Sequence, residues 1–541
     1  MARERRADRR TLAIPPLAAL VAYVLAMKNG FALDDFTLVV RNPFMDTPGG
    51  LRLLLTRGLF EAAAEPLRTD YYRPASSLLN WLSFRLFHDS HVGQHGLNVV
   101  MHMGLSVLLY GTLLRGNVRR TIALVAATLF AVHPANADVV AYVGGRQDML
   151  GWLVVLGGAF ALLRDPRPSL ARAAAIGGVA MLLGTFSREA FLANAAVLPV
   201  LAAFDADGKL APRRAGATAA GTAAGFVLVA IARSMVGVHW NQPGRAHSVG
   251  EWIEGAGGVL ARMVKDLFLP TDLVVDLDVP KLGVPLSLVA LVALVAILPL
   301  GLRALAGSSR RPLFVFGHLS LVATVAVHTP VAMRFGFISD RYAYPFVLGA
   351  ALTLTPLAER AVDHLSKALA ESPLRRILAI VPWLVAVALL PLTWSRVVTW
   401  KDEATLQKDM YEVRPDDPHS KFAEGMRRLQ LGEWQTALDL CTAYHDRYPT
   451  SARPERCIGI ALLKLKRPQE AVPHLAHYAE EHLASVEARV MVIDTMLKLG
   501  DLDGVERTLA EWGPDLAEEP DVVAAHQEVE KRRHPSAPPK P

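Results

Sequence analysis

Long apolar stretches recur through the first 399 of the 541 residues. A helix needs about 20 mostly apolar residues to cross the hydrocarbon core of a bilayer. Hydrophobic residues make up 52% of the chain, too many for an ordinary soluble protein. The sequence therefore predicts an all-α membrane helix bundle of about eleven spans. These spans are 11–27, 94–114, 120–134, 148–163, 172–187, 190–204, 215–235, 284–305, 313–331, 342–360 and 376–394.

Clusters of basic residues fall in every second loop between these stretches. They are Arg3/Arg5/Arg6/Arg9/Arg10, Arg115/Arg119/Arg120, Arg164/Arg167/Arg172, Lys209/Arg213/Arg214, Arg303/Arg310/Arg311 and Lys367/Arg375/Arg376. Because cytoplasmic loops are rich in Lys and Arg, we expect a cytoplasmic N-terminus and an uncleaved first span. An odd number of spans then leaves residues after 399 on the outer side. Membrane loops explain the basic excess, so no nucleic-acid partner is expected.

Two predicted outer loops are long, at about 28–93 and 236–283. The first contains LRLLLTRGLF and LLNWLSFRLF, whose apolar periodicity indicates amphipathic helices at the membrane interface. The alternative is that one of them is a further span. We favour the interfacial helices, because an extra span would reverse every later loop against the charge rule.

A repeat of 34 residues occupies the last quarter of the chain. The strings LQLG at 429–432, LKLK at 463–466 and LKLG at 497–500 stand one period apart, with small residues kept at the same step. This period is typical of tetratricopeptide (TPR) helix pairs, which stack into an α-solenoid. We predict a membrane domain over 1–399, a soluble TPR domain over 400–533 that binds a protein or peptide, and a disordered tail over 534–541.

Cys441 and Cys457, the two cysteines of the chain, fall in neighbouring helices of this repeat. An oxidising compartment would permit a disulfide between them. Two reduced thiols in the helical core are the alternative, and the one that we favour.

An acidic pair, Asp34 and Asp35, follows the first predicted span directly. Neighbouring carboxylates raise one another's pKa, which suits one of them to act as a base near neutral pH. A solvated turn is the alternative. A divalent metal at this pair is possible, although no complete ligand set is visible and we assign no metal ligands.

Other polar residues gather at the outer ends of the spans, where ionisable groups are costly and mark functional sites. His95, Asn98 and His102 share one helix face by their spacing. The remaining candidates are His133, Asp138, Tyr142, Arg146, Asp148, Arg188, Glu189, Asp340, Arg341 and Tyr342. Guanidinium groups hold phosphate oxygens bidentately, so we predict that Arg146, Arg188 and Arg341 bind a donor phosphate. The others would line the cavity. The alternative is a set of ion pairs and hydrogen bonds that only fixes the bundle.

The order of these strings resembles one family. DD…NP, YYRP, LNxxxH, FAVHPxxxDVVAYVxGRxDML, SREA and DRYAYP, followed by TW and the repeat, are similar to the transmembrane-and-TPR protein O-mannosyltransferase-like family of the GT-C superfamily. Asp138, Arg188 and Asp340 stand where that family more often has Glu, Lys and Glu. The resemblance covers roughly 20–512. It implies a sugar donor linked to polyprenyl phosphate, and a catalytic role for Asp35 first and Asp34 second.

We therefore expect an inverting hexosyltransferase of a bacterial inner membrane, with the repeat in the periplasm. The sugar would be mannose, and the acceptor a hydroxyl group of a protein or another molecule. A non-catalytic membrane-anchored TPR scaffold is the main alternative. A transporter of the same lipid is disfavoured, because no motif repeats between the two halves of the membrane part.

Overall fold

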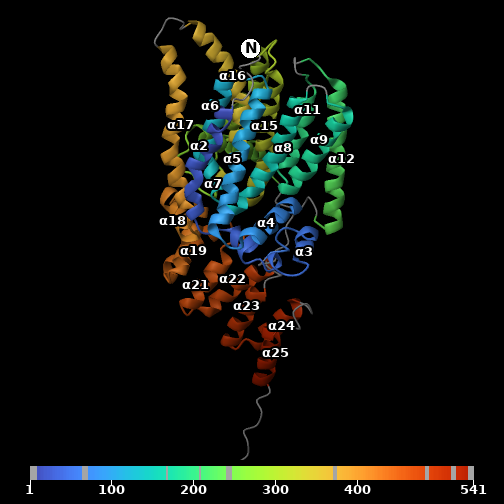
Figure 1. The fold of residues 1–541 in the computed structure, drawn as a ribbon. Helices are drawn as coiled ribbons and strands as arrows, with labels where there is room; N and C mark the ends of the chain where they lie inside the picture. Colours follow the sequence, from blue (N-terminus) through green and yellow to red (C-terminus); the bar gives the residue numbers. More distant parts are fainter. Residues whose placement is uncertain are drawn as a thin grey trace, which may run out of the picture. The chain divides into compact units, whose positions relative to one another are not determined.

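The computed structural model describes residues 9–63, 71–165, 168–205, 209–238, 247–368, 374–481, 486–512 and 520–533. These residues are almost entirely helical (Figure 1). The described chain divides into two compact units, the first running to Leu406 and the second starting at Gln407. The predicted all-α membrane bundle followed by a helical domain is confirmed. The predicted tail, 534–541, lies outside the described residues.

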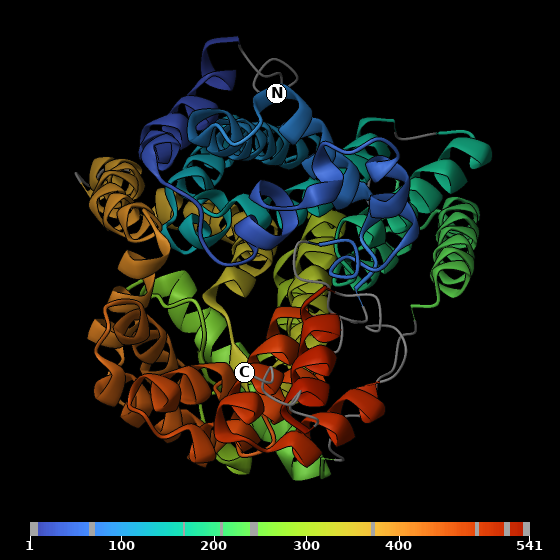
Figure 2. The ribbon, with the colours of Figure 1, turned by 90° about the horizontal axis from the view of Figure 1, so that it is seen from below.

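The long helices of the first unit run side by side in Figure 1, and Figure 2 looks along them. Within the described residues, eight helices are long and apolar enough to cross a membrane. They are Arg10–Lys28, which contains α2 (Ile14–Tyr23), and α5 (His91–Arg115), α8 (Arg146–Arg164), α9 (Leu170–Ser187), α12 (Pro212–Val236), α14 (Val284–Ala304), α15 (Arg311–Phe335) and α17 (Leu374–Thr399).

Three of the eleven predicted spans take another form. The span at 120–134 is α6 (Arg120–Val132), which is bent by 54° against the next helical segment and gives a ninth crossing if the pair is one span. The span at 190–204 is broken into α10 (Phe191–Ala196) and α11 (Leu198–Ala202). The span at 342–360 is α16 (Ala343–Ala368), whose first half is buried against α15. Periodicity alone does not separate a buried helix from a lipid-facing one.

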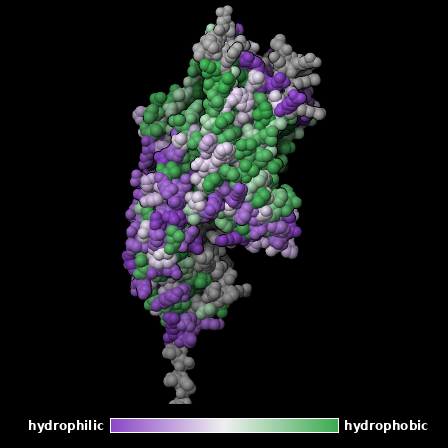
Figure 3. Space-filling model, turned by 60° about the vertical axis from the view of Figure 1, so that its left-hand side comes forward, coloured by the Kyte–Doolittle hydropathy of each residue, from purple (hydrophilic) through white to green (hydrophobic). Residues whose placement is uncertain are grey.

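Apolar side chains remain exposed on the outward faces of the first unit. Figure 3 shows hydrophobic surface gathered over its helices. On α14 the exposed residues include Val289, Val292 and Val295, and only 17% of the most apolar stretch of this helix is buried. Contiguous apolar surface of this kind is unfavourable in water and is what lipid tails cover.

Both long loops contain helices, which the sequence predicted for the first of them, 28–93. The first holds α3 (Gly50–Thr56) and α4 (Pro74–Phe87), and the second holds α13 (Val249–Phe268). A capping box between Ser248 and Glu251 begins α13. Two short antiparallel strands, β1 (Leu277–Asp278) and β2 (Phe337–Ile338), join the second loop to the turn that follows α15. This pairing brings the segment around residue 276 beside residues 339–342.

The second unit consists of helices that pack in sequence order. They are α18 (Glu403–Val413), which begins in the first unit, and α19 (Pro418–Gln430), α20 (Trp434–Arg447), α21 (Glu455–Lys464), α22 (Pro468–Glu481), α23 (Val486–Leu499), α24 (Leu502–Trp512) and α25 (Pro520–Arg533). The repeated strings end α19, α21 and α23. The last residue of each string has a left-handed backbone conformation. These residues are Gly432, Lys466 and Gly500, with φ of 79°, 60° and 77°. This geometry ends a helix and explains why Gly recurs there.

Small residues at the 34-residue step let paired helices approach closely. A Cβ atom at Gly425 would lie 2.6 Å from the sulfur of Cys441, and one at Gly459 would lie 2.4 Å from the Leu475 side chain. Ala437 and Ala471 are fully buried. The predicted period therefore corresponds to a real helix-pair packing, while its assignment to the TPR class stays a prediction.

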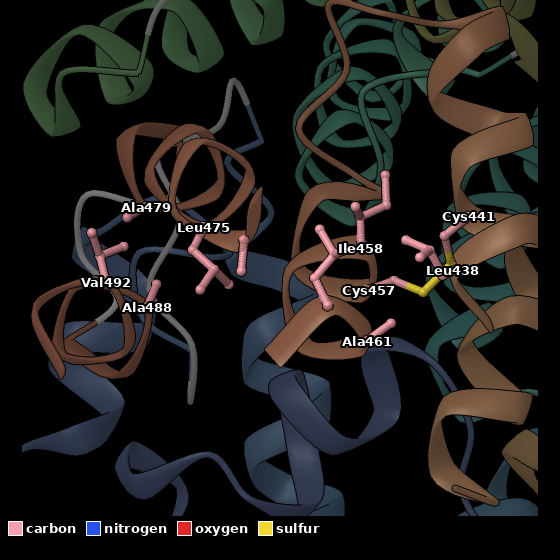
Figure 4. Packing of buried hydrophobic residues seen from close by; sticks show 11 residues of the cluster. Leu438, Cys441, Cys457, Ile458, Ala461, Leu475, Ala479, Ala488 and Val492 are labelled. Atoms are coloured by element: carbon pink, nitrogen blue, oxygen red, sulfur yellow. A yellow bond between two sulfur atoms is a disulfide. The ribbon is translucent and has the colours of Figure 1, made fainter. Parts of the chain in front are cut away.

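Cys441 of α20 and Cys457 of α21 form a disulfide in the core of this array (Figure 4). Our preference for reduced thiols was wrong. Cysteine spacing alone did not reveal that helix packing brings the two Cα atoms to 6.3 Å, within the range that a disulfide bridges. The bond closes a loop with a sequence separation of 16 residues around the turn between the two helix pairs.

We expect the denatured, unreduced protein to expose no reactive thiol, and the reduced protein to expose two. Closing a loop of this length stabilises the array by about 3 kcal/mol through the entropy of the unfolded chain. A Cys441→Ala/Cys457→Ala variant should therefore melt earlier in thermal unfolding of the second unit. Thiol titration of purified protein checks the first point, and two reactive thiols without reductant would contradict it.

Candidate functional site

The acidic pair lies in the chain immediately after the first membrane helix. Asp35 is buried, with 1% of its surface exposed, and Asp34 is half-buried. The Oδ1 atom of Asp35 accepts a hydrogen bond of 2.8 Å from the backbone N–H of Gly144. Its Oδ2 atom accepts a longer one, 3.4 Å, from the N–H of Ala32. One carboxylate oxygen is thus firmly held, and the other is held weakly.

Burial raises the pKa of Asp35 to about 7. The backbone donors and the charge of Arg146 act in the opposite direction, and Asp34 adds a small increase. A carboxyl group with this pKa exchanges a proton near neutral pH, which is the property required of a general base. The prediction that the pair contains such a group therefore has a physical basis, although burial contributes more than the neighbouring acid.

The loop that carries the acidic pair is bonded to the chain just after α17. The N–H of Gly30 donates to the carbonyl of Lys401 (2.6 Å), and the N–H of Leu33 donates to Glu403 Oε2 (2.7 Å). On the other side, His95 Nε2 contacts the Gly30 carbonyl oxygen at 2.9 Å. Leu33 has a left-handed backbone (φ 52°), so its bond to Glu403 helps to hold a turn that is unfavourable for leucine.

Arg146 is fully enclosed at the start of α8. Its Nε donates to Asn98 Oδ1 (3.1 Å) and its Nη1 to Ser83 Oγ (2.6 Å). Its Nη2 donates to both the carbonyl and the side-chain oxygen of Gln94, at 3.1 and 3.0 Å. The sequence predicted a phosphate contact for this guanidinium, whereas in the structure its bonds go to neutral protein acceptors.

Arg341 faces the acidic pair across Tyr142. Its guanidinium carbon lies 5.3 Å from the centre of the Tyr142 ring, and its Nε donates to Ser339 Oγ at 3.0 Å. Burial opposes the charge of Arg341, but Tyr142, Asp276 and Asp34 outweigh it and raise the pKa of the guanidinium. The pKa of Tyr142 is raised by burial and by the charges of both acids. Asp34, Asp35, Tyr142 and Arg341 thus form one electrostatic cluster.

Arg188 continues this cluster on the far side of Tyr342. Its Nη1 pairs with Asp148 Oδ2, and its guanidinium carbon lies 5.1 Å from the Tyr342 ring centre. The His328 ring lies 4.3 Å from that of Tyr342. Side chains from α8, from the turn that follows α9, from α15 and from the turn before α16 therefore meet here.

Glu189, which follows α9, bonds to the first long loop at Tyr72 and Arg73. Its carboxylate accepts from Arg73 Nε (2.7 Å) and from the N–H of Tyr72 (3.0 Å). Arg73 Nη1 also donates to Gln147 Oε1 at 2.6 Å. These contacts fix the loop segment beside Arg188, so Glu189 has a structural partner as well as a place near the cluster.

The remaining predicted residues make internal contacts. Asp340 accepts from Arg262 Nε (2.8 Å) and from the N–H of Val274 (2.6 Å). Asp138 accepts from Arg396 and Trp400. His102 contacts Tyr344, His133 contacts the Leu267 carbonyl, and Asn98 donates to the Tyr142 carbonyl. All five residues are therefore held by contacts within the protein.

Several partners escaped the sequence reasoning, namely Arg73, Arg262, Asp276, Arg396 and Trp400. Arg73 lies in the string YYRP, and Trp400 lies in the TW string, so both were visible signals. Arg262 and Asp266 stand at i and i+4 of an amphipathic helix, a spacing that brings opposite charges together. Over the described residues, no three His, Cys, Asp or Glu side chains are arranged to hold a metal ion.

Comparison with known proteins gives local similarities, and no family model matches the chain. The chain is similar to Protein O-mannosyl-transferase F38B6.6 of Caenorhabditis elegans, with 28% identity over 145 residues, which are 26% of this chain and 21% of the relative. It is also similar to Protein O-mannosyl-transferase TMTC1 of Homo sapiens (30% over 142 residues; 26% and 16%) and TMTC4 of Homo sapiens (31% over 150 residues; 24% and 20%). The matches span about a fifth of these relatives' length.

The Asp138 carboxylate bonds to Arg396 at 2.6 and 2.9 Å, and both side chains are buried. Asp138→Asn would remove the carboxylate charge that both Nε and Nη2 of the buried guanidinium bond to, so we expect a loss of about 3–5 kcal/mol in stability. Thermal unfolding of the full chain in detergent measures it. Asp46→Asn is the matched control, because its pair with Arg85 is exposed and contributes under about 1 kcal/mol. Equal melting of the two variants would contradict the structural role of Asp138.

Proposed function

We propose that the chain is an integral-membrane glycosyltransferase of the GT-C type. It moves a sugar, mannose in the favoured case, from a polyprenyl-phosphate donor to a hydroxyl group of a protein or another acceptor. The carrying observation is the buried carboxyl group of Asp35, poised near neutral pH and facing Arg341 across Tyr142, directly after a membrane helix. The similarity to relatives named O-mannosyl-transferases supports the class of reaction and the sugar.

Asp35 is the proposed base, with Asp34 as the second candidate. The more weakly held Oδ2 of Asp35 takes the proton from the acceptor hydroxyl group. The acceptor oxygen then forms a bond to the anomeric carbon as the bond from that carbon to the phosphate oxygen breaks. Polyprenyl phosphate leaves as an anion with the electron pair, and the sugar carbon is inverted.

The departing phosphate requires cations more than it requires an acid. Arg341 fits this role, because its terminal amino groups make no hydrogen bond with any described residue, while its Nε is fixed by Ser339. Arg188 keeps donors beyond the Nη1 that pairs with Asp148. Both guanidinium groups lie over tyrosine rings, which leaves their edges for a phosphate.

The proposed location is a bacterial inner membrane with the N-terminus in the cytoplasm and the helical array in the periplasm. The alternating basic loops support this orientation. The Cys441–Cys457 disulfide supports it independently, because such bonds persist in oxidising compartments. The array, proposed to be a TPR domain, would recruit the acceptor or a partner protein through its stacked helices.

Asp35→Asn should reduce sugar transfer by about 10²- to 10⁴-fold, because an amide cannot accept the hydroxyl proton. The assay gives radiolabelled polyprenyl-phosphate mannose and crude periplasmic protein to membranes that contain each variant. Asp34→Asn tests the second candidate, and Asp46→Asn controls for a lost surface carboxylate. Full transfer by both Asp35→Asn and Asp34→Asn at normal protein levels would exclude the proposed base. Capture of a partner by the array without turnover of any lipid-linked sugar would favour the scaffold.

The rate should rise with pH through about 7, because only the deprotonated form of Asp35 can act as a base and its pKa is raised to about 7. Measuring kcat/KM for the donor between pH 5 and pH 9, on the order of two units either side of that midpoint, checks this expectation. A rate that is flat across this interval would indicate that another group takes the proton.

A further inference from the structure

Arg146 is tied to two neighbouring helices by neutral acceptors. Ser83 belongs to α4, while Gln94 and Asn98 belong to α5. All three acceptors are buried, as is Arg146 itself. A phosphate group could reach this guanidinium only by displacing the bonds to Ser83 and Gln94, and each would then leave an unsatisfied buried group. This environment differs from that of Arg341, whose terminal amino groups are available.

The contacts of Arg146 lead to Asp35 in two steps. Asn98 accepts from Arg146 through Oδ1 and donates through Nδ2 to the carbonyl of Tyr142, at 2.6 Å. The turn 142–145 then presents the N–H of Gly144 to Asp35 Oδ1 at 2.8 Å. The turn is tight, because a Cβ atom at Gly145 would lie 2.1 Å from the Val139 carbonyl oxygen. Small displacements of this turn would therefore move the donor that fixes the carboxylate.

We infer that Arg146 is a positioning residue, which holds the turn 142–145 so that Gly144 fixes one oxygen of Asp35 while the other receives the proton. The inference rests on the proposed function, in which Asp35 is the base. The guanidinium makes no hydrogen bond to a carboxylate, so its positive charge acts through space and favours the ionised form of Asp35.

Other charged and titratable groups around the same loop also influence the titration of Asp35. Asp34 and Tyr142 adjoin Asp35, and Arg341 lies beyond Tyr142. His95 of α5 contacts the loop at Gly30, and Glu403 of α18 contacts it at Leu33. Variants at Arg146 leave all of these in place, so a change in the titration of Asp35 reports the lost guanidinium charge together with any displacement of the Gly144 donor.

The test compares Arg146→Gln with Arg341→Gln in the full-length protein. Infrared spectra measure the protonation of Asp35 through its carboxyl band, which is assigned by its absence from Asp35→Asn. The titration runs from pH 5 to pH 10, on the order of two to three units around the midpoint. Arg146→Gln should move the midpoint of this band upward by about one to two pH units. At pH 7 it should lower kcat for transfer from polyprenyl-phosphate mannose by about 10- to 100-fold, with KM for the donor within about twofold of wild type. Arg341→Gln should raise this KM.

Asn98→Leu separates position from charge. It removes the bonds to Arg146 and to the Tyr142 carbonyl but keeps the guanidinium, so kcat should fall. Any rise of the Asp35 midpoint in this variant comes from displacement of the Gly144 N–H, which favours the ionised carboxylate, and not from loss of the charge. Arg214→Gln is the matched control for loss of a buried arginine, since among the described residues the Arg214 guanidinium donates to the carbonyls of Leu162 and Phe204 and to no site residue. It should leave the Asp35 midpoint unchanged.

A raised donor KM with an unchanged Asp35 midpoint in Arg146→Gln would overturn the inference and make Arg146 a phosphate ligand. Wild-type kcat in Asn98→Leu would overturn it as well. If Arg146→Gln does not accumulate, Arg146→Lys replaces it. That variant keeps a positive charge but loses the planar set of guanidinium N–H donors. It should therefore lower kcat with a smaller shift of the Asp35 midpoint. An active Asp35→Asn variant would exclude Asp35 as the base. The effect of Arg146 on the titration of Asp35 is tested separately, because the infrared measurement needs no turnover.

Discussion

Buried arginine–carboxylate contacts hold together the end of the first unit where the acidic pair lies. Asp138 with Arg396, Asp340 with Arg262, and Asp148 with Arg188 each join segments that are distant in the sequence. A charge in the interior is costly unless it is paired or fully hydrogen-bonded, so each contact admits few arrangements of its loop. The turns that carry Tyr142, Arg341 and the acids are fixed by these contacts, which lets short loops form a defined cluster.

Local patterns in the sequence predicted much of the fold. Hydropathy located the membrane helices, and the 34-residue step located the turns at Gly432, Lys466 and Gly500. The number of spans was harder to predict, since a helix covered by protein and one covered by lipid have similar compositions. The disulfide and the pair of Asp138 with Arg396 depend on contacts between residues that only the fold brings together. For the disulfide the sequence offered both cysteines but not their proximity, and for the ion pair it offered Asp138 without Arg396.

Three arginines that looked equivalent in the sequence have different surroundings. Arg146 is enclosed by neutral acceptors, Arg188 has a carboxylate partner, and Arg341 keeps its terminal amino groups unbonded among the described residues. The charge is the same in each case, but the desolvation and the bonds already made decide what each can bind. Motif position alone therefore overstated the similarity of the three. Arg188 and Arg341 both lie near Tyr342, and their phosphate-binding role stays a prediction.

The segment that follows α17 belongs to two structures at once. Trp400 donates to Asp138 and lies 5.2 Å from the Tyr142 ring, Glu403 bonds to Leu33, and the same stretch continues into α18. A fragment begun at residue 400 would carry these groups away from the membrane domain and expose them to water. The two compact units divide later, after Leu406 and inside α18. The border predicted from the sequence, at residue 400, therefore differs from the border between the two compact units, at Leu406.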